Sequence, residues 1–559
     1  MTQSGLENPQ ETGASLLRDV EALVACGPRV AGSPAERAAA NYIVSELRAA
    51  GLSPELLEWD AWISLPAKEA WIETADGVRI AGKGVAFAAD SGAAGVRGPL
   101  RRLDEPGRLD GAIVLVDGLP HLARLEAAAS RGAQAVVAVS ADDHAHYWQI
   151  SPLWGSPARA ADLARMAPIP ALQVSRSDGE RLAQLACDRG AVRLVAPVDS
   201  GWRRVVMPTV SIPGREAGEL LIGGHYCSWG PGATDNAAGN ALMLDLARRH
   251  AGGPRPRFGL RLAWWTGHEQ GGYAGSAHFA DVFHDVLAAH ALAYLSVDNV
   301  GSRGATIWQV QNTGAELHDY ATGIRDRLAP LDPAAAGFAR TLLPARKDRG
   351  IPASRPARNG DQSFGGLGLA SLQVASWLAE DAADRIPGTG LPWWWHTDED
   401  KPAYCDHAVL ARDLAVHVAL VEGLVNAQTL PIDPAAQARD LVAALQAVVE
   451  SAPELALAPE LLALAETYAD SVATRALSDG QRVALTKTLN PVLFHGLSAT
   501  EFDMTRQSAL LPGLSAALDW PGLPAEQRRF AEIGLRRAAN RVAAAIRSAL
   551  SLLQNEATP

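Results

Sequence analysis

Histidine and carboxylate side chains follow several apolar segments of the chain, where they could bind metal ions. The segment 220–242, LLIGGHYCSWGPGATDNAAGNAL, is typical of a short strand, a Gly-rich turn and the start of a helix. His225 ends the strand, and Asp235 precedes the helix. Nitrogen and oxygen donors both suit a borderline divalent ion. Alone, the segment could equally be a Gly-rich loop with an incidental His and Asp, because single motifs often mislead.

Three later segments place further donors in the same way. Glu269 follows the apolar run RLAWW, Asp298 ends the run AYLSVD, and His396 follows LPWWW. Each donor lies where an apolar run stops in a turn, which is where an α/β fold presents its binding groups. Together with His225 and Asp235 they make five donors at loop ends. Five donors that share one carboxylate are enough to bind a pair of metal ions.

The order of these segments resembles the two-zinc aminopeptidase and carboxypeptidase family, nearest to its glutamate carboxypeptidase and transferrin-receptor-like branch. The resemblance is carried in chain order by GGHYCS, GATDNAAG, WTGHEQGGYAGS, LSVDNVGS, NGDQSFGGLG and HTDED. It implies two divalent ions, expected to be zinc. His225 and Asp298 would bind one ion. Glu269 and His396 would bind the other, and Asp235 would bridge them.

Two positions depart from the family pattern. The family's catalytic base is the first Glu of a Glu-Glu pair, and His268 stands there. An imidazole has an ordinary pKa of about 6.5, so His268 could accept a proton, and two nearby cations should keep it neutral. A packing role is the alternative. Cys227 replaces an Asp that usually orients the first ligand, His225. Asp400 is expected to support His396, four residues before it.

The leading hypothesis is a dinuclear metal-dependent hydrolase of an amide or peptide bond. A metal-bound water would attack, the second ion would stabilise the oxyanion, and His268 would replace the family's Glu base. One alternative is a repurposed enzyme, such as a lyase, a cyclase or a small-molecule amidohydrolase. Another is a non-catalytic, receptor-like homologue, whose sign would be lost ligands; all five are present.

The elements that must position these residues favour an α/β fold. Residues 1–64 and 205–435 alternate strands with helices and resemble the mixed-sheet, zinc-exopeptidase-like catalytic domain. Residues 65–204 carry short strands and many glycines, and resemble the inserted protease-associated (apical) domain. Residues 436–559 show helical spacing and resemble the dimerisation domain of the receptor branch, which predicts a homodimer.

Two further clusters could contact a substrate. The three tryptophans at 393–395 suggest an apolar or aromatic wall, whereas Trp264 and Trp265 on a strand are expected to be core. A basic loop could bind a substrate carboxylate through bidentate contacts, or could simply be solvated. Its cationic residues are Arg346, Lys347, Arg349, Arg355 and Arg358.

Composition narrows the partners. The 559 residues carry 50 basic and 62 acidic side chains, a net charge of −12, which argues against a dedicated nucleic-acid surface. The four cysteines have no paired spacing, so a reducing compartment fits better than a disulfide framework. No signal-peptide pattern opens the sequence, and no apolar run reaches about 18 residues. We expect a cytoplasmic protein with a peptide or small-molecule substrate and no nucleic-acid or membrane partner.

Overall fold

A seven-stranded mixed sheet forms the centre of the structure, a computed structural model that describes residues 9–330, 354–356, 360–498, 500–502 and 509–554. The four strands β12, β11, β13 and β15 are parallel, and antiparallel strands flank them on both sides. The four parallel strands are apolar because helices on both faces of the sheet bury nearly all of their residues. In spatial order the strands are β1 (Glu55–Pro66), β10 (Val198–Ile212), β12 (Gly259–Trp265), β11 (Glu219–His225), β13 (Ala291–Ser296), β15 (Ala370–Leu378) and β14 (Ala305–Gln311).

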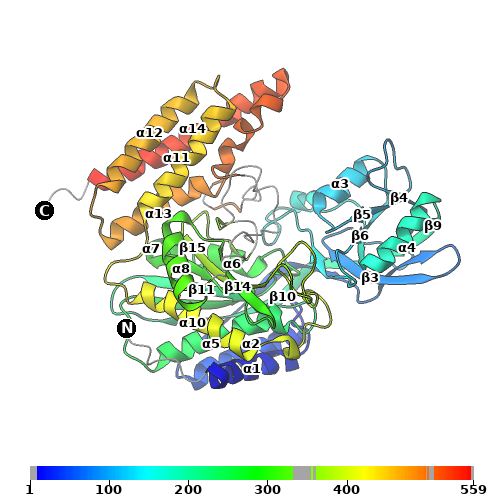
Figure 1. The fold of residues 1–559 in the computed structure, drawn as a ribbon, viewed down its shortest axis with the longest axis horizontal. Helices are drawn as coiled ribbons and strands as arrows, with labels where there is room; N and C mark the ends of the chain where they lie inside the picture. The colour runs from blue at the N-terminus through cyan, green and yellow to red at the C-terminus, as the bar shows by residue number, and fades with distance from the viewer. Residues whose placement is uncertain (1–8, 331–353, 357–359, 499, 503–508, 555–559) are drawn as a thin grey trace.

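Helices cover the two faces of this sheet (Figure 1). Successive side chains of a strand point to opposite faces. In β11, Leu220 and Ile222 accordingly join one core cluster, and Leu221 joins the other. The first face carries α1 (Pro9–Ala25), α2 (Pro34–Ala49), α5 (Ala238–Ala251), α8 (Ala315–Leu328) and α10 (His407–Val425). The second face carries α6 (Ala274–Val282) and α7 (His284–His290).

A second sheet of eight strands lies to one side of the first (Figure 1). Strand β2 pairs with both β9 and β3, so the sheet closes on itself. The paired strands β1 and β10 lead into it and out of it. We call residues 70–195 the closed-sheet unit; it falls inside the predicted segment 65–204. Its elements are β2 (Ala70–Thr74), β3 (Arg79–Ala86), β4 (Val96–Arg102), β5 (Ile113–Asp117), α3 (Leu122–Ser130), β6 (Ala135–Val139), β7 (Trp148–Gln149), η1 (Ala160–Arg165), β8 (Ala171–Val174), α4 (Arg176–Cys187) and β9 (Ala191–Val195).

The C-terminal part is helical and has its own apolar core. Asn490 and Lys487 tie it to the seven-stranded sheet and its helices, the predicted catalytic part. Asn490 donates to Glu316 at 3.0 Å, and Lys487 donates to the carbonyl of Ala288 at 2.8 Å. We call residues 434–554 the helical unit. It contains α11 (Pro434–Ser451), α12 (Leu457–Ala473), α13 (Asp479–Leu493), η5 (Pro512–Ala517), η6 (Trp520–Gly522) and α14 (Ala525–Gln554). The predicted fold class, α/β with an added sheet unit and C-terminal helices, is confirmed.

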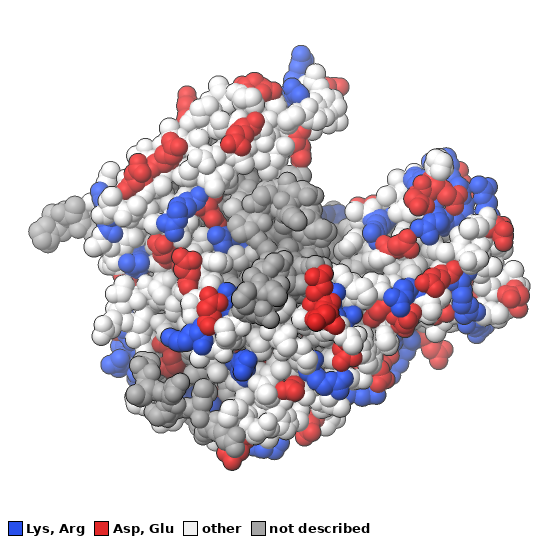
Figure 2. Space-filling model, viewed as in Figure 1, with Lys and Arg blue, Asp and Glu red and all other residues white. Residues whose placement is uncertain are grey.

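Charged side chains of both signs are interspersed on the face shown in Figure 2, and the closed-sheet unit carries many of each. The net charge of −12 is therefore not gathered into one acidic surface on this face. Within the described ranges, no helix is long and apolar enough to cross a membrane.

Candidate metal centre

The five predicted ligands come together at the carboxyl ends of the parallel strands. His225 is the last residue of β11, and Glu269 and Asp298 follow the ends of β12 and β13. Asp235 lies in the segment Ala233–Ala237 that precedes α5, and its own backbone angles are not helical. His396 lies in the loop after β15. Parallel strands end at the same edge of a sheet, so residues far apart in sequence meet there.

Asp235 faces both histidines, one with each carboxylate oxygen. Its Oδ1 lies 2.9 Å from His225 Nε2, which is also 3.6 Å from Asp298 Oδ1. Its Oδ2 lies 3.1 Å from His396 Nε2, which is also 3.1 Å from Glu269 Oε1. These contacts define two groups that share Asp235, and within each group the donor atoms lie within 4.8 Å of one another. A shared carboxylate is what a pair of adjacent cations requires.

The chemistry of this donor set fits divalent cations. Three carboxylates and an imidazole are buried here, and burying carboxylates is costly unless cations neutralise them. His225 Nε2 has no hydrogen-bond partner among the described residues, although an Asp235 oxygen is only 2.9 Å away. Burial alone would raise the pKa of Asp235, but His225 and His396 hold it well below its usual range. Burial opposes a charge on His396, yet Glu269 and Asp235 raise its pKa to about 10. Bound cations would displace the protons that these carboxylates hold on the imidazoles.

Asp400 supports the segment that carries Asp235, so the prediction that it supports His396 is wrong. It accepts hydrogen bonds from the Thr234 backbone at 2.9 Å, the Thr234 hydroxyl at 2.8 Å and the Asp235 backbone at 3.0 Å. A buried carboxylate is stabilised by such hydrogen-bond donors, which replace the water it has lost. His396 instead donates from Nδ1 to the backbone carbonyl of Tyr147, at 2.8 Å, in the closed-sheet unit.

A backbone carbonyl replaces the orienting carboxylate that Cys227 displaces. His225 Nδ1 donates to the carbonyl of Cys227 at 3.0 Å, and the Cys227 sulfur is 4.0 Å from the same nitrogen. This hydrogen bond keeps a proton on Nδ1, so Nε2 is the nitrogen that could bind a metal ion once its own proton is displaced.

Arg29 has a structural role in the loop between the first two ligands. Its buried guanidinium donates to the carbonyls of Tyr226, Pro231 and Gly232 at 2.7, 2.7 and 2.8 Å. These contacts bind the loop to the turn that follows α1, so Arg29 holds His225 and Asp235 at a constant separation.

His268 lies beside the first ligand group and is held by a carboxylate. Its ring stacks on that of His225, with centroids 4.0 Å apart and planes at 16°. Its Nδ1 lies 2.7 Å from Asp361 Oδ2, while Asp361 Oδ1 accepts from Ser276 at 2.7 Å. Burial and His225 oppose a charge on His268, but Asp361 outweighs them and the pKa of His268 is raised. His225, His268 and Glu269 also form a third group of donor atoms within 4.8 Å.

Asp361 was not among the predicted site residues. Its segment, NGDQSFGGLG, contributed to the family resemblance, but nothing in the sequence paired it with His268, 93 residues away.

The tryptophans lie partly in the core and partly beside a predicted ligand, and Arg355 of the basic loop is held by α11. Trp264, Trp265 and Trp394 are fully buried core residues, whereas Trp395 stacks on His396. Arg355 forms an ion pair with Asp440 of α11. The other basic loop residues, Arg346, Lys347, Arg349 and Arg358, lie outside the described residues.

Residues 209–421 match the model of peptidase family M28, and they include all five donors. Through this region the chain is similar to peptidase family M28. The predicted family and the predicted class of enzyme, a metal-dependent hydrolase, are thereby confirmed. The individual roles of the M28 site residues remain predictions.

Relatives of the chain are named as aminopeptidases and as glutamate carboxypeptidases. The probable lipoprotein aminopeptidase LpqL of Mycobacterium tuberculosis is 28% identical over 372 residues, which cover 62% of this chain and 68% of that protein. The probable glutamate carboxypeptidase VP8 of Zea mays is 28% identical over 357 residues, or 51% of this chain. The chain thus spans about half the length of the maize protein, 50%.

Solved structures share the fold. The aminopeptidase from Aneurinibacillus sp. strain AM-1 matches with a TM-score of 0.54 and 18% identity, over 74% of this chain and 94% of that one. A zinc aminopeptidase from Bacillus subtilis matches with a TM-score of 0.55 and 19% identity, over 76% and 97%. At these identities the likeness supports the zinc-exopeptidase-like architecture of the M28 part.

Proposed function

We propose that this M28 hydrolase cleaves an amide or peptide bond with two divalent ions, expected to be zinc. The observation that carries the proposal is Asp235, which turns one oxygen to each of two histidine-carboxylate groups. The names of the aminopeptidase relatives point in the same direction. Ions bound there would supply Lewis-acid activation of water and of the scissile carbonyl.

His268 would handle the proton in this reaction. Asp361 is a carboxylate acceptor for Nδ1–H, so the proton of a neutral His268 ring belongs on Nδ1 and Nε2 is left as the proton acceptor. The stacked ring of His225 fixes the plane of the His268 ring. His268 would accept a proton from the attacking water and return it to the leaving amine, while Asp361 and Ser276 hold its orientation.

Removal of metal should abolish hydrolysis. We expect the purified protein to carry up to two divalent ions per chain by elemental analysis. A panel of peptides, aminoacyl amides and N-acyl amino acids should reveal turnover that disappears with a chelator and returns with zinc. We expect weak activity on simple aminopeptidase substrates. A Glu carboxylate has a second oxygen that can contact a free substrate amine, whereas an imidazole has no oxygen. Undiminished turnover by the metal-free protein, or no turnover of any amide by the metal-loaded protein, would contradict the proposal.

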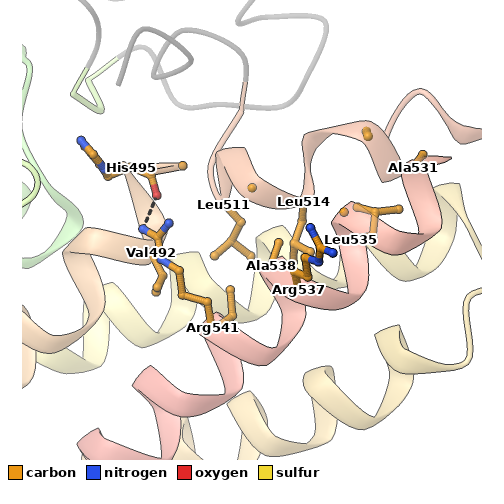
Figure 3. Close-up of a pocket in the computed structure, with 14 residues that line it drawn as sticks. Val492, His495, Leu511, Leu514, Ala531, Leu535, Arg537, Ala538 and Arg541 are labelled. Carbon is orange, nitrogen blue, oxygen red and sulfur yellow. Dashed lines mark hydrogen bonds between the residues drawn. The ribbon is translucent and has the colours of Figure 1, made fainter. Parts of the chain in front are cut away.

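We also propose that the chain forms a homodimer through the helical unit. Phe530 and Ile533 of α14 are 71% and 57% exposed, and exposed large apolar side chains mark interaction surfaces. Neighbouring residues of α14, among them Ala531, Gly534 and Leu535, line a pocket of about 380 Å³ together with residues of α13 and η5. In Figure 3, Leu511 and Leu514 lie beside this helix, and Arg541 donates to the His495 carbonyl.

Charged residues on α14 should therefore weaken the dimer. The double variant Phe530→Asp, Ile533→Asp is expected to be monomeric by light scattering at micromolar concentrations where the wild type is dimeric. Val282→Asp is the matched control, since Val282 on α6 is 58% exposed but lies in the catalytic part. A monomeric wild type at the same concentration would count against the proposal.

A further inference from the structure

We propose that Trp148 and Trp395 form a subsite for an aromatic or large apolar group next to the scissile bond. The inference rests on the proposed amide hydrolysis and names the class of substrate. Trp395 belongs to the catalytic part and Trp148 to the closed-sheet unit, so the two parts of the chain would build the subsite together.

The two indole rings lie directly beside a metal-ligand candidate. The Trp395 ring stacks on the His396 ring, with centroids 3.5 Å apart and planes at 13°. The Trp148 ring meets Trp395 edge-on at 5.7 Å and lies 6.0 Å from His396. Both tryptophans are only half-buried, whereas neighbouring Trp394 is fully buried. Part of each indole ring therefore remains accessible beside His396.

Hydrogen bonds between the two parts of the chain hold these rings in place. Tyr147 N–H donates to the carbonyl of His396 at 2.8 Å, and His396 Nδ1 donates back to the Tyr147 carbonyl at 2.8 Å. His146 Nδ1 donates to the carbonyl of Trp395 at 2.6 Å. Trp148 follows directly in β7, which pairs with β3. The aromatic surface is thus preorganised, which lowers the entropic cost of binding a substrate.

The residues next to Trp148 favour an uncharged substrate group at the subsite. Tyr147 stacks on the buried ring of Trp229, with centroids 5.4 Å apart and planes at 10°. Lys83 packs over the Tyr147 ring and donates to its hydroxyl at 3.0 Å. The charge of Lys83 is neutralised by an ion pair with Asp398. Trp148 and Trp395 therefore present ring surface, and no unpaired charge of Lys83, to a substrate.

These positions define the substrate class. His396 shares a ligand group with Glu269 and Asp235, so a carbonyl held at that group would place a neighbouring side chain against the two rings. Aromatic rings pair favourably edge-to-face or offset-stacked at centroid distances of about 4.5–7 Å. The side chains of phenylalanine, tyrosine and tryptophan and large aliphatic side chains fit this subsite. An alanine or a charged side chain would make no favourable contact with the two rings.

The test compares matched substrates with Trp148 variants of the metal-loaded protein. One series varies the acyl side of the scissile bond and another varies the leaving group, each from alanine to phenylalanine. We expect the wild type to prefer phenylalanine in at least one series. Trp148→Ala should lower kcat/KM for that substrate by about 10–200-fold, the usual range for a lost apolar contact, and leave the alanine substrate nearly unchanged. Trp202→Ala, at a 57% exposed position, should change neither.

Two further measurements separate a substrate contact from a structural role. Trp148→Phe keeps an aromatic ring and should retain most of the preference, and metal content should equal that of the wild type. Calorimetry should show that Trp148→Ala weakens the binding of free phenylalanine more than that of alanine.

Equal wild-type rates for alanine and phenylalanine in both series would overturn the subsite while leaving amide hydrolysis intact. Equal losses on both substrates in Trp148→Ala and Trp148→Phe would do the same. If no amide is cleaved at all, the proposed function fails first; equal binding of phenylalanine and alanine would then overturn the subsite independently.

Discussion

Replacement of Asp235 by alanine should remove both metal ions and reduce hydrolysis to background. Each of its carboxylate oxygens faces a different histidine, and Asp235 is the residue shared by the His225–Asp298 group and the His396–Glu269 group. Elemental analysis after gel filtration measures the metal content directly. The increase in melting temperature that zinc produces in the wild type should also disappear, because ligands that bind only the folded state stabilise it by mass action.

Variants that affect one ligand group, or neither, provide the comparison for Asp235→Ala. Asp298→Ala should weaken only the group that contains His225, and so leave about one ion per chain. Glu399→Ala removes an exposed carboxylate in the His396 loop, paired only with Lys401 among the described residues, and should retain both ions. Two ions per chain in Asp235→Ala would rule out a bridging role for this carboxylate.

His268→Ala should lower turnover on the true substrate by about 10²–10⁴-fold while both metal ions stay bound. This is the usual range for the loss of a general base. The expectation follows from geometry: Asp361 accepts from Nδ1, which leaves Nε2 as the acceptor beside the first ligand group. Turnover under saturating substrate and metal content, measured on the same preparation, check it.

The partners of His268 allow sharper controls. Asp361→Asn should also reduce turnover with metal retained, because an amide N–H donated to Nδ1 would move the ring proton to Nε2 and block the acceptor. His268→Glu recreates the family's Glu-Glu pair and is expected to raise activity on simple aminopeptidase substrates. Wild-type turnover in His268→Ala would mean that the residue only packs. Loss of one ion in that variant would instead make His268 a metal ligand, as its grouping with His225 and Glu269 permits.

The sequence alone determined the chemical types of the donors and the architecture that unites them. His225, Glu269 and Asp298 each follow an apolar run, and helices on both faces bury those runs as parallel strands. Because parallel strands share one carboxyl edge, the order of the motifs was enough to predict that His225, Glu269 and Asp298 would converge. The same local patterns predicted the C-terminal helices, since a buried helix face repeats every three to four residues.

Only the tertiary structure decided which groups orient those donors. His396 is held by a backbone carbonyl 249 residues away in the closed-sheet unit, and every residue carries such a carbonyl, so no residue type marks it in a sequence. Asp400 lies four residues from His396 but turns to the N–H groups before α5. Asp361 reaches His268, and Trp148 reaches Trp395, from separate elements. Side-chain direction in a loop depends on the packing of distant elements, so local sequence could determine the ligands but not the contacts that orient them.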